Sequence, residues 1–190
     1  MILPITAYGH QTLKKVGEDI TKDYENLDTL IENMFETMYF SKGIGLAAQQ
    51  INRAIRLFVI DPTPYSDDYP ELKDFKKVFI NARITNDEGE EVDFEEGCLS
   101  IPGINEKVKR KSVIYLSYYD EEFNFHENVR FEGLLSRVIQ HEYDHNEGKL
   151  FIERLPNFKK LLLKGKLRDI STGNVDVAYK MILPRKKSRK

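Results

Sequence analysis

The stretch that decides the fold is Gln140-His141-Glu142-Tyr143-Asp144-His145-Asn146-Glu147-Gly148. It contains the H-E-x-x-H pattern, in which two histidines stand four residues apart. On a helix, four residues span just over one turn, about 6 Å of rise, so both imidazoles project from one face and can bind one metal ion. Glu142 lies near that face and can take a proton from a metal-activated water. The pattern therefore predicts the metal centre of a hydrolase.

The residues around the pattern favour a helix. Gly148 fits a helix terminator. The alternative is an amphipathic helix whose histidines serve only packing or solvent contact, but two of only four histidines stand here with a glutamate between them. Before the pattern, apolar residues recur at helical spacing and predict a face turned toward a core: Leu134, Leu135, Val138 and Ile139.

The composition is typical of a globular chain. With 190 residues, 41% hydrophobic and 32% charged, the sequence is long enough for one domain with a sizeable core. A net charge of −2 gives no electrostatic case for binding a specific nucleic acid or a membrane. No apolar run approaches the ~20 residues of a membrane span, and the N-terminus lacks the pattern of a signal peptide. We therefore expect a cytoplasmic protein.

Hydrophobic periodicity predicts the local structure. After an irregular arm over 1–23, a helix is expected over about 25–41, with one apolar face toward the core. A turn is expected through residues 86–89. Strands are expected over 56–61, 77–84, from Val92 onward, 113–119 and 123–131.

The C-terminal quarter predicts three further features. Pro156 opens a short helix over residues 161–163. Alternating apolar residues predict a last strand over 174–182. A basic tail over 184–190 is expected to be disordered and solvated, with RNA contact as the alternative. A single domain over residues 1–183 accounts for the rest.

A third protein ligand is needed, because two histidines hold a catalytic metal poorly. Downstream of the pattern, Glu147 and Glu153 are present but no further histidine follows. Upstream stands Cys98, the only cysteine, at a glycine-flanked strand end. A thiolate beside a divalent cation ligates as the anion. A buried structural cysteine is equally compatible with the spacing.

Three segments resemble the motifs of peptide deformylases, in that family's order and at compatible spacing: GIGLAAQQ at 43–50, EGCLS at 96–100 and QHEYDH at 140–145. Taken alone, the first segment is equally typical of a helix end. The predicted elements and the resemblance together favour an α+β fold, with mixed or antiparallel strands packed around a central H-E-x-x-H metal-binding helix.

The resemblance implies an activity and its residues. The family removes the formyl group from the N-terminal formylmethionine of newly synthesised polypeptides and releases formate. Glu142 would be the general base. The Gln50 amide and the Leu99 backbone N–H would stabilise the developing oxyanion. The implied metal ligands are Cys98, His141 and His145.

The resemblance also implies how the substrate binds. The peptide would add as a strand along two backbone segments. These contain Ile44, Gly45 and Leu46, and Glu96 and Gly97. A methionine pocket would be lined by Ile44, Phe94, Leu134 and Val138, with His141 at its floor.

The family implies Fe(II) as the metal, with Zn(II), Ni(II) or Co(II) as substitutes, because a mixed thiolate and imidazole set suits several ions. The implied partners are nascent N-formylmethionyl polypeptides, with a transient ribosome contact.

The sequence departs from the family pattern in places. Gln49 stands where many relatives have Pro, and Asn52 where Gly is common; we expect altered loop rigidity here. An Arg that binds the substrate backbone in many relatives falls near Asn105, which leaves Lys107 or Arg110 as substitutes. The last predicted strand replaces a long C-terminal helix.

Two other functions compete with this interpretation. One is a peptidase that cleaves ordinary peptide bonds and has an acidic third ligand in place of Cys98. The other is a binding module that engages ribosomes through residues 185–190. Neither accounts for Gln50 and the Cys98 motif occurring together.

Overall fold

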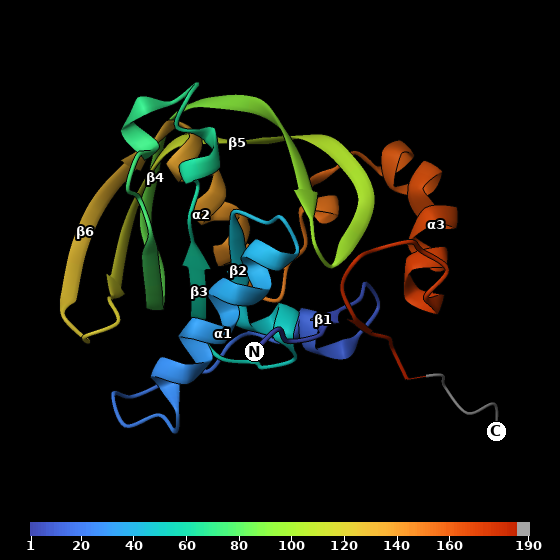
Figure 1. Ribbon diagram of the computed structural model, residues 1–190. Coiled ribbons are helices and arrows are strands. Elements are labelled where there is room, and N and C mark those ends of the chain that lie inside the picture. The colour runs from blue at the N-terminus through green and yellow to red at the C-terminus, as the bar shows by residue number, and fades with distance from the viewer. Residues whose placement is uncertain (186–190) are drawn as a thin grey trace.

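A computed structural model describes residues 1–185 of the chain, so the predicted basic tail lies almost wholly outside the described residues. A five-stranded antiparallel sheet has the order β2-β3-β4-β5-β6, and a separate two-stranded parallel sheet pairs β1 with β7. Figure 1 shows β4 and β5 arching over the molecule, with α2 beneath them. The helices are α1 (Leu27–Phe40), α2 (Gly133–Asn146) and α3 (Asn157–Thr172). The strands are β1 (Ile5–Thr6), β2 (Gly45–Ala47), β3 (Leu57–Ile60), β4 (Lys77–Cys98), β5 (Ile101–Tyr119), β6 (Phe125–Glu132) and β7 (Met181–Ile182).

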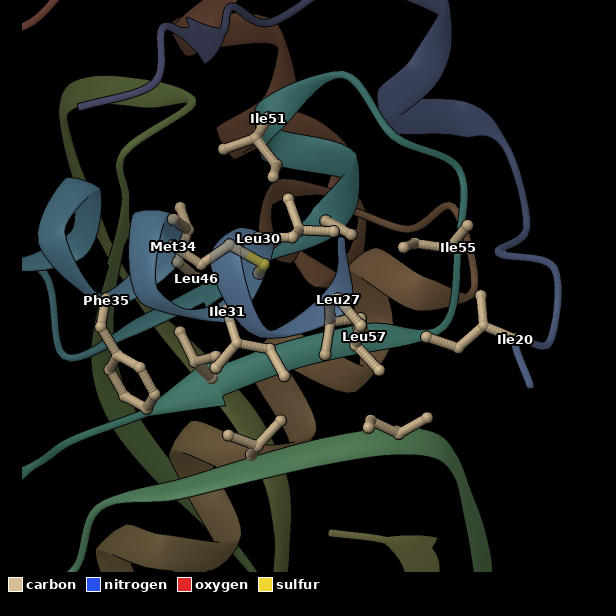
Figure 2. Packing of buried hydrophobic residues seen from close by; sticks show 14 of the residues in the cluster. Ile20, Leu27, Leu30, Ile31, Met34, Phe35, Leu46, Ile51, Ile55 and Leu57 are labelled. Carbon is tan, nitrogen blue, oxygen red and sulfur yellow. The ribbon is translucent and has the colours of Figure 1, made fainter. Parts of the chain in front are cut away.

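The sheet separates two hydrophobic clusters, because successive side chains on a strand point to opposite faces. On β3, Leu57 and Val59 pack beneath α1, whereas Phe58 and Ile60 pack with residues of α2. Figure 2 shows the α1 side, with Leu27 of the helix lying beside Leu57. Strand β3 is fully buried because it contributes side chains to both clusters. The predicted α+β fold is confirmed.

The predicted helix over 25–41 is confirmed as α1, but the turn predicted through residues 86–89 is wrong. Those residues continue β4, which pairs with β5 across a register shift between Glu88 and Glu91. Gly89 has a φ of +78°, a conformation that glycine adopts without strain. The local turn signal was therefore that of a bulge in a long, curved strand.

Helix α2 ends as the sequence predicts. Gly148 has a φ of +68°, and its N–H donates to the carbonyl of His145 at 3.0 Å. The next N–H, of Lys149, donates to the carbonyl of Asp144 at 2.8 Å. A Cβ on Gly148 would lie 2.7 Å from the carbonyl oxygen of Lys14. Glycine is thus required both to end the helix and to let the N-terminal arm approach it.

The C-terminal predictions need correction. The predicted short helix is the sixteen-residue α3, and of the predicted strand 174–182 only Met181 and Ile182 form β7. We call residues 174–182 the return segment, because they bring the chain from α3 back to β1 (Figure 1). Apolar alternation identified its inward face, but only two of its residues find a partner strand.

Candidate metal centre and active site

Cys98, His141 and His145 converge at one point between the end of β4 and helix α2. Their ligand atoms all lie within 4.8 Å of one another, and Cys98 Sγ is 3.4 Å from His145 Nε2. A tetrahedral site with ordinary metal–sulfur and metal–nitrogen bonds separates such atoms by roughly 3.6 Å. The three side chains of the predicted ligand set therefore surround a common point.

Glu96 orients the first histidine. Its Oε2 lies 2.9 Å from His141 Nδ1, which leaves Nε2 of that ring free to ligate. Burial opposes ionisation of Glu96, yet hydrogen bonds from Arg110 and His141 outweigh it and hold the pKa of Glu96 well below its ordinary value. Burial lowers the pKa of His145 to about 3, so that imidazole is neutral, the form that binds metals.

A buried ionic network fixes Glu96 in turn. Arg110 donates from Nε and Nη2 to its two carboxylate oxygens at 2.6 and 2.8 Å. The same guanidinium donates from Nη1 to Asp144 Oδ2 at 2.6 Å. Because the side chain of Arg110 is fully buried, it holds α2 against β4 and β5 and does not reach a substrate. One of the two substitutes considered for the substrate-binding Arg is therefore a structural residue.

Glu142 has the environment of a general base. Its Oε2 is buried and has no hydrogen-bond partner among residues 1–185. Burial raises the pKa of Glu142 to about 7, which suits proton exchange near neutral pH. Gly45 allows this approach, because a Cβ there would lie 2.5 Å from Glu142 Oε1.

Gln50 is held in a defined orientation. Its Oε1 accepts the N–H of Ala47 at 2.8 Å, so its amide NH₂ points the other way, 3.5 Å from both Cys98 Sγ and Ser100 Oγ. The short 3₁₀ helix that carries it, Ala48–Ile51, ends at Asn52 with a φ of +62°. The donor predicted for an oxyanion therefore faces the metal centre.

A cavity of about 580 Å³ opens beside these groups. Leu46 is the exception among the predicted substrate residues, because its side chain is fully buried beneath α1 and it does not line the cavity. Leu99, Gln50, Cys98, His141 and Glu142 also line the cavity. The other predicted substrate residues all line it, namely Ile44, Gly45, Phe94, Glu96, Gly97, Leu134 and Val138.

Several cavity residues were missed from the sequence. Arg137 precedes His141 by one helical turn, a spacing that could have revealed it; it donates to Glu96 at 3.0 Å. Asn105 lines the cavity, whereas neither Lys107 nor Arg110 does. Val177 and Tyr179 enter from the return segment, and no local signal connects them to the site.

The donor set fits a resident metal. One thiolate and two imidazoles are ligands for Fe, Zn, Ni or Co, and the unpartnered carboxylate oxygen of Glu142 lies in the same site. Cys98, His141 and His145 would hold the ion.

Comparison with known proteins identifies the family. The model of the polypeptide deformylase family matches residues 2–161. The chain belongs to this family. The peptide deformylase of Flavobacterium johnsoniae is 50% identical over 188 residues, covering 95% of each chain. The solved peptide deformylase of Legionella pneumophila superimposes with a TM-score of 0.80 at 36% identity, over 92% of this chain and 98% of its own. That of Thermus thermophilus also gives a TM-score of 0.80, at 38% identity, over 91% of this chain and 99% of its own.

Family membership settles the reaction class. Peptide deformylases are hydrolases with a catalytic metal that remove the formyl group from the N-terminal methionine of nascent polypeptides, and this chain is such a hydrolase. Within residues 1–185, no helix has the length and apolar character needed to cross a membrane.

Two departures from the deformylase pattern have structural partners. Gln49 is fully buried and accepts a hydrogen bond from Asn146 Nδ2 at 2.9 Å, at the end of α2. Asn52 tolerates the left-handed backbone conformation that favours glycine, and its Oδ1 accepts from Thr12 Oγ1 at 2.7 Å. Both substitutions tie the Gln50 segment to its neighbours.

Proposed function

We propose that this deformylase hydrolyses N-formylmethionyl peptides with Glu142 as general base, Cys98, His141 and His145 as metal ligands, and Gln50 with the Leu99 N–H as oxyanion donors. The observation that carries the proposal is the convergence of the three ligand side chains on one point, beside a cavity that Glu142, Gln50 and Leu99 line. We assign residues 1–183 to the catalytic domain.

The substrate backbone would extend the sheet. β2 is the first strand in the sheet order, so within residues 1–185 one of its edges has no neighbouring strand. The carbonyl of Ile44 accepts the N–H of Asp61 at 2.9 Å and so faces β3, and alternate residues of a strand bond to opposite neighbours. A peptide strand at the free edge can therefore bond to the backbone of Gly45 on one side and approach Gly97 on the other. The apolar side chains of Ile44, Phe94 and Val138 would enclose the methionine.

The chain's own groups would move the proton. Glu142 takes a proton from the attacking water and later delivers it to the departing methionine amine, so that formate leaves as the second product. Gln50 Nε2 and the Leu99 N–H donate to the oxygen on which negative charge develops. The bound metal supplies Lewis-acid polarisation and lowers the pKa of water.

Fe(II) is the metal we propose, because the resemblance favours it and the thiolate with two imidazoles accepts it. We also infer a cytoplasmic location and a transient contact with the ribosome, where formylated nascent chains arise.

Formate release from an N-formylmethionyl tripeptide tests the proposal. Protein would be purified without oxygen and supplied with Fe(II). We expect rapid release that a chelator abolishes and that Fe(II), Zn(II), Ni(II) and Co(II) restore to different extents. Failure to release formate, by protein that holds one metal ion per chain, would refute the proposal and direct attention to unformylated peptides.

The base is tested by Glu142→Gln. We expect kcat to fall by about 10²–10⁴-fold while the metal content stays at one per chain. Glu132→Gln is the matched control, because Glu132 precedes the same helix and is exposed beside Arg130. Equal activity of the two variants would exclude Glu142 as the base.

A further inference from the structure

The return segment is anchored at both ends. Near its C-terminal end, β7 pairs with β1, and the N–H groups of Ile5 and Ala7 donate to the carbonyls of Lys180 and Ile182 at 2.8 and 2.9 Å. Near its start, Val175 packs against the third hydrophobic cluster, which includes Leu163 and Leu167 of α3. Anchors on both sides hold the intervening residues in place.

Alternation turns one face of the segment inward. Residues 175, 177, 179 and 181 are half-buried, whereas 176, 178 and 180 are exposed. The inward residues divide by position, since Val175 and Met181 pack on the third cluster while Val177 and Tyr179 line the cavity. The middle of the segment therefore forms a wall of the active site.

Tyr179 connects this wall to the metal centre. Its hydroxyl donates to the backbone carbonyl of Leu99 at 2.8 Å, one residue beyond Cys98. Burial raises the pKa of Tyr179 to about 12, so the hydroxyl keeps its proton and remains a donor. The side chain of Leu99 packs closely against Gly43, two residues before β2 begins. A Cβ on Gly43 would lie only 2.9 Å from Leu99 Cδ1.

The lining of the cavity falls into two groups. Ile44, Phe94, Leu134 and Val138 belong to or pack against the cluster of α2, and we call this group the α2 end. Leu99, Val177 and Tyr179 also line the cavity but are not part of that cluster, and the exposed Asp176 lines it with them. A single methionine side chain fills only part of about 580 Å³, so a peptide whose methionine occupies the α2 end has room to continue toward Val177 and Tyr179.

We propose that Val177 and Tyr179 form an apolar subsite for the substrate residue that follows the methionine, and that Tyr179 positions the Leu99 main chain. This inference rests on the proposed function, since it assigns the methionine to the α2 end. The C-terminal return segment would thus select among nascent chains by their second residue.

The subsite is tested with two substrates, N-formylmethionyl-alanine amide and N-formylmethionyl-leucine amide, using the Fe(II)-loaded full chain. In Val177→Ala, we expect the ratio of kcat/KM for the leucine substrate to kcat/KM for the alanine substrate to fall about fivefold. A fully enclosed contact would give a larger change, but Val177 is only half-buried. Val175→Ala is the matched control; it removes the same atoms from the same segment but faces the third cluster. We expect its ratio to equal that of the wild type.

An unchanged ratio in Val177→Ala, with active wild-type enzyme, would overturn the subsite and leave the proposed function standing. The same shift in both variants would also overturn it, since a loosened segment would then be the cause. A metal-loaded wild type inactive on both substrates would overturn both proposals.

Tyr179→Phe tests the positioning role, because it keeps the ring and removes the hydroxyl. We expect kcat to fall about fivefold with KM, metal content and the substrate ratio unchanged, since one hydrogen bond to the Leu99 carbonyl is lost. Tyr115→Phe is the control; it loses a 2.9 Å hydrogen bond to Glu88 away from the cavity. A kcat for Tyr179→Phe equal to that of the control would refute the positioning role.

Discussion

Helices α1 and α2 have fourteen residues each and pack on opposite faces of the same sheet, but they bury different chemistry. The buried residues of α1 are apolar except for Thr37. On α2 most buried residues are polar or charged: Ser136, Arg137, Gln140, Glu142, Asp144, His145 and Asn146.

The two helices therefore differ in how burial of their side chains affects the free energy of folding. Apolar burial on α1 contributes to stability at each position. Buried charges on α2 are unfavourable unless they are paired, and Arg110, Arg137 and Arg154 supply most of the pairing. Glu142 remains unpaired among the described residues, which is the arrangement that catalysis needs.

Breaking the network on the α2 side should have the largest effect. Arg110→Leu removes the fully buried guanidinium that Glu96 and Asp144 share, so that Glu96 keeps only Arg137 and Asp144 keeps only the more exposed Arg154 as arginine partners. We expect the free energy of unfolding to fall by about 4 kcal/mol. Urea denaturation measures it. Arg83→Leu, which breaks an exposed pair with Asp19, should cost less than about 1 kcal/mol. Similar losses for the two would contradict the comparison.

On the α1 side, a cavity should lower stability without touching the chemistry. Met34 is fully buried, so Met34→Ala should lower the free energy of unfolding by about 3 kcal/mol. Formate release by the folded variant should equal that of wild type, because Met34 does not line the cavity. Glu32→Ala, exposed on the same helix, should change stability by less than about 0.5 kcal/mol. Loss of kcat in Met34→Ala would show that the two faces are coupled.

Removing the metal should act on α2 and on the Cys98 end of β4, but not on α1. At free metal a hundredfold above its dissociation constant, binding adds about 2.7 kcal/mol of stability, so chelation should speed amide hydrogen exchange in 133–146. Exchange in α1 should change little. Mass spectrometry of peptic fragments measures the exchange in both helices. An equal acceleration of exchange in α1 and α2 would contradict the expected difference between them.

The smallest effect is expected at the contact between β2 and α2. Gly45→Ala places a methyl group against the Glu142 carboxylate, and we expect kcat/KM to fall about tenfold as the base shifts. Steady-state formate release measures it. Gly165→Ala in α3 meets open space and should leave activity unchanged. An active Gly45→Ala would mean that Glu142 has more room than the distances indicate.

Much of the fold was predictable because the signals are local. The apolar stripe of α1, the terminator Gly148 and the run at β3 each follow from spacing within one segment. The turn predicted at 86–89 failed because its glycine and polar residues suit a bulge equally well, and pairing with β5 decides between them. The strand predicted over 174–182 failed because a strand needs a partner, and β1 offers only two residues.

The sequence by itself determined which residues could hold a metal and act as base, since His141, Glu142 and His145 lie within little more than one helical turn. Only the tertiary structure decided that Cys98 joins them, that the buried Arg110 bridges Glu96 and Asp144, and that Val177 and Tyr179 line the cavity. These contacts join residues between 14 and 80 positions apart, from Arg110 with Glu96 to Tyr179 with Leu99, and no local spacing encodes which distant segments the packed core brings together.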